Sequence, residues 1–251
     1  MMSIDSYLNS FQKISLDETM SVSLMSRVDK KFVFSIKQIS KLLIDLMDFY
    51  NILEINKSKI QKYNSLYYDT IDRMFFFQHH NNRVNRHKVR FREYVGSGLS
   101  FLEVKCKNNK KKTIKNRIQV DSISSDGLSK DQKQYIDTIL GKKLILVPQQ
   151  YVSFDRITLI NKSKTERLTI DLNLEFSNNT NSGKMSDIVI AEIKKDRSSY
   201  SSQFTRVAKS QAIYPFRISK YCMSTIKLNP GIKHNRFKEK LLLINKIKQL
   251  T

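Results

Sequence analysis

The sequence predicts an α+β fold built on a closed antiparallel β-tunnel of about eight strands, with helices inserted between strands and packed outside. Three observations support this prediction. Stretches of alternating apolar and polar residues are joined mostly by short turns. Six of these stretches carry Arg or Lys on their polar side. The 251 residues contain 6 Gly and 3 Pro, too few for a flexible linker, while 40% hydrophobic residues suffice for a packed core.

The first third of the chain mixes helices with strands. We expect a short amphipathic helix with a polar tail over residues 3–20 and a strand over 26–34. A helix over 35–50 follows; its first residue is a serine that can cap it, and its apolar residues recur at helical spacing. A second strand is expected over 63–69, and a short helix or turn over 71–80.

A β-hairpin is the clearest local signal. Residues 87–95 alternate, Gly96-Ser97-Gly98 forms the turn, and residues 99–107 alternate again. The basic segment 108–112 is a polar turn that leads into a further strand over 113–120.

The second half continues with a helix, three strands and three more helices. The first helix covers residues 129–140, with Gly141 as its C-cap. The strands are expected over 151–159, 167–176 and 188–195, and the last helices over 201–213, 219–227 and 236–250.

No boundary is sharper than a loop, so the division into parts is simple. We expect an N-terminal helical segment (1–25), a tunnel domain (26–228) and a C-terminal amphipathic helix (229–251). The Lys-rich C-terminal helix is compatible with an acidic membrane surface and equally with a cover over the tunnel.

The composition indicates an anionic partner. The formal net charge is +22, far more than solubility requires, so nucleic acid, polyphosphate, a nucleotide or an anionic membrane surface is the natural ligand. Cys106 and Cys222 form no CxxC motif, which fits a reducing compartment. Neither a signal peptide nor an apolar run of about 20 residues is recognisable, so a cytoplasmic protein is expected.

The charged faces of the strands point to a binding site. For any single strand, a solvated sheet face is the simpler explanation. A solvated face has no reason to interleave carboxylates with Arg and Lys so regularly, whereas a tunnel with a polar interior does. Side chains that share this face by alternation are Arg27, Asp29, Lys31, Lys88, Arg90, Arg92, Glu103, Lys105, Lys115, Arg117, Arg167, Asp171, Glu192 and Lys194.

Such an interior needs a ligand to balance its charge. Crowded cations repel one another, and phosphate is the anion that Arg binds best, since two of its donors match two oxygens. Carboxylates in the same space require a divalent cation between them and the phosphate, and oxygen ligands favour Mg²⁺ or Mn²⁺. A nucleic-acid binding protein would instead carry its basic residues outside, so that partner is disfavoured.

Other features have ordinary explanations. His79, His80 and His87 are expected to be plain polar residues rather than a metal site. The aromatic residues at 67–68 and 75–77 are expected in the core rather than on a nucleobase. No GxxxxGK[ST] motif occurs, so a P-loop is not indicated.

Eight short motifs follow one another along the chain. They are RVDKK (27–31), LYYDT (66–70), NRHKVRFR (85–92), SGLSFLEVK (97–105), FDR (154–156), RLTID (167–171), AEIK (191–194) and SKY (219–221). Taken in this order, they resemble the VTC domain, the catalytic domain of the vacuolar transporter chaperone polyphosphate polymerases, over about residues 26–222. This family belongs to the triphosphate tunnel metalloenzymes, which have the CYTH-like fold.

The resemblance implies a metal-dependent polyphosphate polymerase that uses ATP. It assigns Glu192 as the main metal ligand, with Glu103 assisting, and Mn²⁺ or Mg²⁺ as the cofactor. The positions implied to be catalytic are Lys31, Arg90, Arg92, Lys105, Arg156, Arg167 and Lys220. Further phosphate-binding residues, from the strand faces, are Arg27, Lys88, Lys115, Arg117 and Lys194.

Two alternatives stay open. The hydrolase branch of the superfamily begins with an ExExK strand, whereas Arg27 and Asp29 occupy its acidic positions here. This departure favours the polymerase over a tripolyphosphatase or nucleoside triphosphatase of the same fold. A non-catalytic polyphosphate or nucleic-acid binding module is the other alternative. ATP and polyphosphate are the expected partners, with a separate membrane protein for any export of the product.

Overall fold

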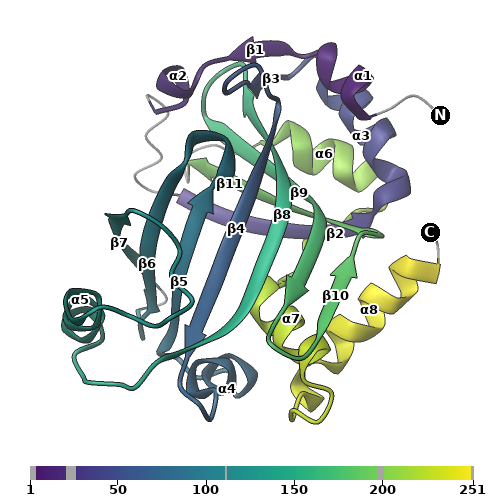
Figure 1. Ribbon diagram of the computed structural model, residues 1–251. Coiled ribbons are helices and arrows are strands. Elements are labelled where there is room, and N and C mark those ends of the chain that lie inside the picture. The colour runs from purple at the N-terminus through teal and green to yellow at the C-terminus, as the bar shows by residue number, and fades with distance from the viewer. Residues whose placement is uncertain (1–3, 21–26, 111, 197–200, 250–251) are drawn as a thin grey trace.

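The strands form a single sheet, which Figure 1 shows as the centre of the molecule. The structure, a computed structural model, describes residues 4–20, 27–110, 112–196 and 201–249. Every pairing between strands is antiparallel except the one between β1 and β3. The predicted class, α+β with an antiparallel sheet and helices outside it, is confirmed.

The main path of paired strands runs β2-β11-β9-β8-β4-β5-β6-β7. Among the described residues, β2 and β7 do not pair with each other, so backbone hydrogen bonds do not close the predicted ring. The bounds are Gln12–Ile14 (β1), Arg27–Ser35 (β2), Tyr50–Leu53 (β3), Ile60–Asp69 (β4), Arg86–Tyr94 (β5), Leu99–Lys107 (β6), Thr113–Val120 (β7), Val147–Asn161 (β8), Glu166–Ser177 (β9), Ser182–Met185 (β10) and Ile188–Asp196 (β11).

The helices lie before, between and after the strands in the chain (Figure 1). The longer ones begin and end close to their predicted bounds. They are Ile4–Asn9 (α1), Leu16–Met20 (α2), Ile39–Leu46 (α3), Met74–His80 (α4), Lys130–Leu140 (α5), Gln203–Ser210 (α6), Lys220–Leu228 (α7) and Lys238–Gln249 (α8), with short 3-10 helices at Ile36–Gln38, Val95–Ser97 and Asn235–Phe237.

Apolar side chains on one face of the sheet form two cores. On β2, β8, β9 and β11 they pack with α1, α3 and α6. On β4, β5 and β6 they pack with α5. Strand alternation explains this: Leu168 and Ile170 are fully buried on this face, while Arg167, Thr169 and Asp171 point the other way. Burying one face leaves the opposite face for polar residues.

The opposite face is divided along its length. At one end Val33, Val152, Phe176 and Ile190 pack into a third core with α7 and α8. The charged side chains therefore occupy part of this face rather than all of it. Strand β2 shows the division within itself, since Lys31 is on the charged part and Val33, two residues later, is in the core. Alternation predicts which face of the sheet a side chain lies on, but it does not predict where along that face the charged residues give way to the core.

The C-terminal helix packs against the body of the protein. Ile244 and Ile247 of α8 are buried in the third core, and Lys248 forms an ion pair of 3.3 Å with Asp187. Of the two settings considered for this helix, the structure shows packing against the sheet. No helix within the described residues is long and apolar enough to cross a membrane.

Several predicted helix ends are confirmed by their hydrogen bonds. The hydroxyls of Ser35 and Ser129 accept backbone N–H groups in capping boxes. Gly141 ends α5 in the left-handed region, with φ of 66°. The Ser35 cap begins the 3-10 helix that leads from β2 into α3, and the Ser129 cap begins α5.

Three elements differ from prediction. The expected helix over 3–20 is instead α1, strand β1 and α2. The expected helix over 35–50 ends at Leu46, because residues 50–53 pair with both β1 and β8 as strand β3. Strand β10 was not predicted. It pairs with β9, and its Gly183 lies so close to the Phe176 ring that a Cβ there would come within 2.7 Å.

Candidate active site

The strand register brings most of the predicted site residues together. In strands β5 and β6, Arg90 pairs with Glu103, and Lys88 pairs with Lys105. Toward the β2 end of the sheet, Arg156 of β8 pairs with Asp171 of β9, Asp171 pairs with Ile190 of β11, and Glu192 of β11 pairs with Lys31 of β2. All these charged side chains lie on the face opposite the first two cores.

A short segment before α7 connects the two sides. The Lys31 ammonium donates to the carbonyl of Ile218 at 3.3 Å, and the Lys88 ammonium donates to Ser219 Oγ at 3.0 Å. Lys220, the first residue of α7, forms an ion pair with Asp171. Residues 218–220 therefore bridge β2, β5 and β9, none of which pairs with another of the three in the sheet.

Glu103 is the centre of the first charge cluster. Its side chain is 1% exposed, and it accepts hydrogen bonds from Arg90 Nε at 2.8 Å, Arg90 Nη2 at 2.5 Å and Lys115 Nζ at 3.0 Å. Arg90 also donates to the Tyr67 hydroxyl at 3.0 Å. Burial alone would raise the pKa of Glu103, but the charges of Arg90, Arg92 and Lys115 outweigh burial and lower it.

Asp171 is the centre of the second cluster. Arg156 donates to its two oxygens at 2.6 and 2.8 Å, and Lys220 forms an ion pair with it. Burial opposes ionisation, yet the charges of Arg156 and Lys220 lower the pKa of Asp171 to about 2. For Lys220, burial dominates and lowers the pKa to about 8. Lys220 is thus a lysine whose charge changes near neutral pH.

Glu192 is the centre of the third and more open cluster. Its side chain is 20% exposed, in contact with the Lys194 ammonium and 3.6 Å from that of Lys31. Lys194 also forms an ion pair of 3.4 Å with Asp29. Despite burial, the charges of Lys31 and Lys194 lower the pKa of Glu192.

Three cations, the buried Arg92 and the half-buried Lys88 and Lys105, have no carboxylate partner among the described residues. Arg92 makes one long hydrogen bond, Nε to Ser65 Oγ at 3.4 Å, and lies over the rings of Tyr63 and Phe154 at 5.4 and 5.8 Å. Lys88 donates to Ser219, and Lys105 faces Lys88 and Lys115 across the ladders. The charge of Arg90 and burial lower the pKa of Lys105 well below its usual range. This is the electrostatic pattern of a site prepared for an anion.

The remaining predicted residues lie at the margins. Arg167 Nη2 donates to the carbonyl of Thr19 at 2.9 Å. Arg117 is exposed on β7 and lies over the Phe101 ring at 4.6 Å. The backbone of Arg27 begins β2, and its side chain falls outside the described part of the structure.

Sequence reasoning missed several side chains that shape this site. Tyr63, Ser65 and Tyr67 support Arg92 and Arg90. Asp171 was placed on the charged face by alternation but was given no role in the site. The rings of Tyr63 and Phe154 stack with centroids 5.3 Å apart. The alternation of β4 was the available signal, since it places residues 63, 65 and 67 on one face. Tyr67 was expected in the core; it is buried there and also holds Arg90.

The donor set fits a divalent cation at Glu192 better than at Glu103. Glu103 already accepts three charge-assisted hydrogen bonds and has almost no exposed surface. Glu192 is partly exposed and paired with flexible lysines. No group of three His, Cys, Asp or Glu side chains suited to a metal occurs among the described residues. His80 and His87 accordingly have amide partners, Asn235 and Gln78.

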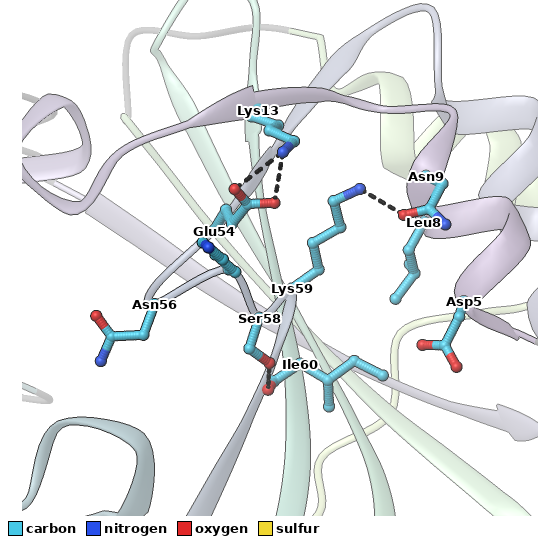
Figure 2. A pocket seen from close by; sticks show the side chains of 10 residues that line it. Asp5, Leu8, Asn9, Lys13, Glu54, Asn56, Ser58, Lys59 and Ile60 are labelled. Carbon is cyan, nitrogen blue, oxygen red and sulfur yellow. Dashed lines mark hydrogen bonds and ion pairs between the residues drawn. The ribbon is translucent and has the colours of Figure 1, made fainter.

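A pocket of about 640 Å³ lies away from this site (Figure 2). Its lining comes from α1, β1 and the turn between β3 and β4, and Figure 2 shows Lys13 paired with Glu54, and Lys59 bonded to Asn9. It contains none of the predicted site residues.

The structure is thus an α+β fold with an antiparallel sheet, one face of which gathers basic side chains and their carboxylate partners. A family model described as the VTC domain matches residues 26–229. The chain therefore belongs to the VTC domain family, and the resemblance seen in its motifs is confirmed. Membership makes it one of a family of tunnel enzymes.

Solved structures with some likeness to the chain include three from distant organisms. A putative adenylate cyclase from Vibrio parahaemolyticus is 13% identical and covers 80% of this chain and 99% of its own, with a TM-score of 0.47. A putative adenylyl cyclase from Hippeastrum, described as having a dominant triphosphatase activity, is 14% identical, with coverages of 84% and 100% and a TM-score of 0.49. A Pyrococcus horikoshii protein is 12% identical, with coverages of 79% and 98% and a TM-score of 0.41. No curated protein matches.

Proposed function

We propose that this chain is a metal-dependent polyphosphate polymerase, which transfers the terminal phosphoryl group of ATP onto a phosphate chain. One observation carries the proposal: the buried Arg92 and the half-buried Lys88 and Lys105 have no carboxylate partners among the described residues and lie beside cations that are already paired. Removing unpaired cations from water costs free energy, and a bound anion offsets this cost. A phosphate chain supplies several negative charges at a regular spacing.

The paired cations in this proposal hold the phosphate chain in position. Arg90 is fixed by Glu103 and Tyr67, and Arg156 by Asp171, so their remaining donors are pre-oriented. Lys31 and Lys220 have flexible stems and can exchange a carboxylate for a phosphate oxygen. Positioning and neutralisation of charge of this kind supply most of the catalysis in phosphoryl transfer.

Glu192 would hold the divalent cation. Mg²⁺ is usually bound by one or two carboxylates together with substrate phosphates, so a single partly exposed carboxylate fits this role. When bound, Mn²⁺ or Mg²⁺ would withdraw charge from the transferred phosphoryl group. We assign Glu103 to a different task from the one the resemblance implies, as the counter-ion that fixes Arg90 and Lys115.

The proposed step is an in-line displacement. An oxygen at the end of the phosphate chain attacks the γ-phosphorus of ATP, a new P–O bond forms, and the bond to the bridging β–γ oxygen breaks. ADP leaves with the electron pair, and the chain grows by one phosphate. Arg90, Arg92 and Lys220 would bind the oxygens on which negative charge is spread.

The first strand supports chain extension over hydrolysis. Asp29 is paired with Lys194 rather than free to activate water, and Arg27 occupies the other acidic position of the hydrolase pattern. Export through a separate membrane protein and a cytoplasmic location stay predictions.

The test is to incubate the purified chain with ATP and Mn²⁺ and to look for long polyphosphate by gel electrophoresis. Accumulation of polymer, lost in Glu192→Gln and kept in Lys41→Ala, a change on the exposed side of α3, supports the proposal. Release of orthophosphate without polymer would identify a triphosphatase. Binding of polyphosphate without any turnover, unaffected by Glu192→Gln, would identify a binding module.

A further inference from the structure

A group of aromatic side chains extends the charged site beyond Arg92. Phe101 of β6 lies directly opposite Arg92 in the β5–β6 register, and Tyr94 lies two residues beyond Arg92 on the same face. The ring centroids of Tyr94 and Phe101 are 5.8 Å apart, and those of Tyr63 and Tyr94 are 4.9 Å apart. Tyr94 and Phe101 are both partly exposed, and Tyr94 also packs against the edge of the third core.

An arginine covers one of these rings. The guanidinium of Arg117 lies 4.6 Å from the centroid of Phe101, and Arg117 is exposed on strand β7. Its neighbour across the ladder is Glu103, whose carboxylate already accepts from Arg90 and Lys115. Arg117 and Phe101 thus form a two-layer platform that combines a planar cation with an aromatic ring, and both layers stack well on nucleobases.

The distance from this platform to the unpaired cations suits a nucleotide. Phe101 and Lys105 are four residues apart on β6, or about 14 Å at the rise of a strand. On the neighbouring strand Arg92 lies opposite Phe101, Lys88 lies opposite Lys105, and Arg90 lies between these two positions. That separation is comparable to the reach of an extended nucleoside triphosphate from its base to its terminal phosphate.

We propose that Arg117, Phe101 and Tyr94 bind the nucleobase of the nucleoside triphosphate, whose phosphates extend past Arg92 toward Lys105 and Lys88. This inference rests on the proposed function, because it needs the phosphates in the charged site. Stacking uses the face that every base has, so the platform accepts purines with little discrimination. ATP and GTP should bind with affinities within a few-fold of each other.

The test compares ATP with inorganic tripolyphosphate, which has the phosphates but no base. Calorimetry in EDTA, where no turnover occurs, gives both affinities for the full chain and for Phe101→Leu, Phe101→Trp and Tyr214→Leu. Tyr214 is an aromatic residue that is 61% exposed and lies outside the site. Thermal melting shows that each variant is folded.

We expect Phe101→Leu to weaken ATP binding at least about fivefold, as for the loss of one base stack, and to change tripolyphosphate binding less than about twofold. Phe101→Trp and Tyr214→Leu should retain ATP affinity. Equal ATP affinity in Phe101→Leu and the parent, or an equal loss for both ligands, would overturn the platform while leaving the proposed function intact. A parent chain that binds neither ligand would overturn both.

Discussion

Two neighbouring arginines on strand β5 have opposite electrostatic surroundings. Arg90 is bound on its fork by Glu103 and on its other edge by Tyr67, whereas Arg92 has Ser65 at 3.4 Å and two aromatic faces. Burial and the nearby charge of Arg90 lower the pKa of Arg92. The first arginine is therefore held in place by its partners, and most donors of the second have no protein acceptor among the described residues.

Replacing Arg92 by Met should separate binding from stability. The variant loses a phosphate ligand and also loses the repulsion from Arg90 and Arg156. We expect tripolyphosphate affinity to fall at least about tenfold, since one charge-assisted contact is worth roughly 1.5–3 kcal/mol. The free energy of unfolding in urea should stay the same or increase. A clear loss of stability would show that Arg92 has a structural role that its contacts do not reveal.

Replacing Arg90 by Met should lower the free energy of unfolding, unlike the change at Arg92. Glu103 would remain buried with Lys115 as its one ion-pair partner among the described residues. Breaking a buried pair by removing one partner costs about 3–5 kcal/mol. A urea transition that moves to lower denaturant by this amount would confirm the role, and an unchanged midpoint would contradict it.

The affinity for ATP should decrease as the pH rises from about 7.5 to about 9.5. Burial lowers the pKa of Lys220 to about 8, so its ammonium loses the proton, and its attraction for phosphate, within this range. The phosphate groups themselves ionise near pH 6 and do not oppose the change. Lys220→Arg keeps its charge and should show a smaller decrease by calorimetry. Constant affinity across the range would exclude a titrating lysine from the site.

At the scale of residues, alternation along the strands identifies the side chains and not their partners. The period of two correctly places Lys88, Arg90 and Arg92 on one face. That Glu103 binds Arg90 and Lys115 depends on the register of three strands, which the sequence does not contain. Tyr67 was assigned to the core because the sequence does not distinguish a tyrosine that only packs in the core from one that also accepts a hydrogen bond from an arginine.

Helix α7 is the element that joins the two sides of the site. Its capping residue Ser219 accepts from Cys222 N–H and from Lys88, and its first residue, Lys220, pairs with Asp171. Farther along, the Tyr221 hydroxyl donates to Asp69, and its ring stacks on Tyr67 at 4.9 Å. The start of this helix is thus held by buried contacts to β4.

Asp69→Asn should loosen this helix start. The Asp69 carboxylate accepts the N–H groups of Thr70, Phe75 and Phe76 as well as the Tyr221 hydroxyl. An amide turns an NH₂ group toward these donors and leaves buried groups unsatisfied, at a cost of about 1–3 kcal/mol. Urea denaturation measures this loss, and Tyr221→Phe, which removes one hydroxyl alone, should lose less. Two variants as stable as the parent would show that α7 is held elsewhere.

The prediction of helices and strands succeeded where neighbouring residues in the sequence determine the element, and it failed where pairing with a distant strand determines it. The caps at Ser35, Ser129 and Gly141 depend on neighbouring residues and were readable. Strands β3 and β10 are four residues each and exist because β8 and β9 offer them an edge. Segments this short contain too few alternating residues to be predicted as strands from the sequence.

For the molecule as a whole, the net charge of +22 makes its stability depend on the ligand. Cations concentrated on one face repel one another until an anion neutralises them. Tripolyphosphate at 100 times its dissociation constant should stabilise the fold by about 2.7 kcal/mol. Thermal melting in matched concentrations of NaCl is the control for ionic strength. Equal melting temperatures with tripolyphosphate and with NaCl would contradict a specific anion site.

Strand β7 has a further consequence for behaviour in solution. It ends the path of the sheet and pairs with β6 alone among the described strands, so its outer backbone groups are open to another chain. Lys115 and Arg117 are exposed along it. Charged side chains on an edge strand deter the edge-to-edge pairing that leads to aggregates. The same two residues would thus keep the protein monodisperse at high concentration, and Lys115→Thr with Arg117→Thr should increase light scattering at concentrations where the parent stays clear.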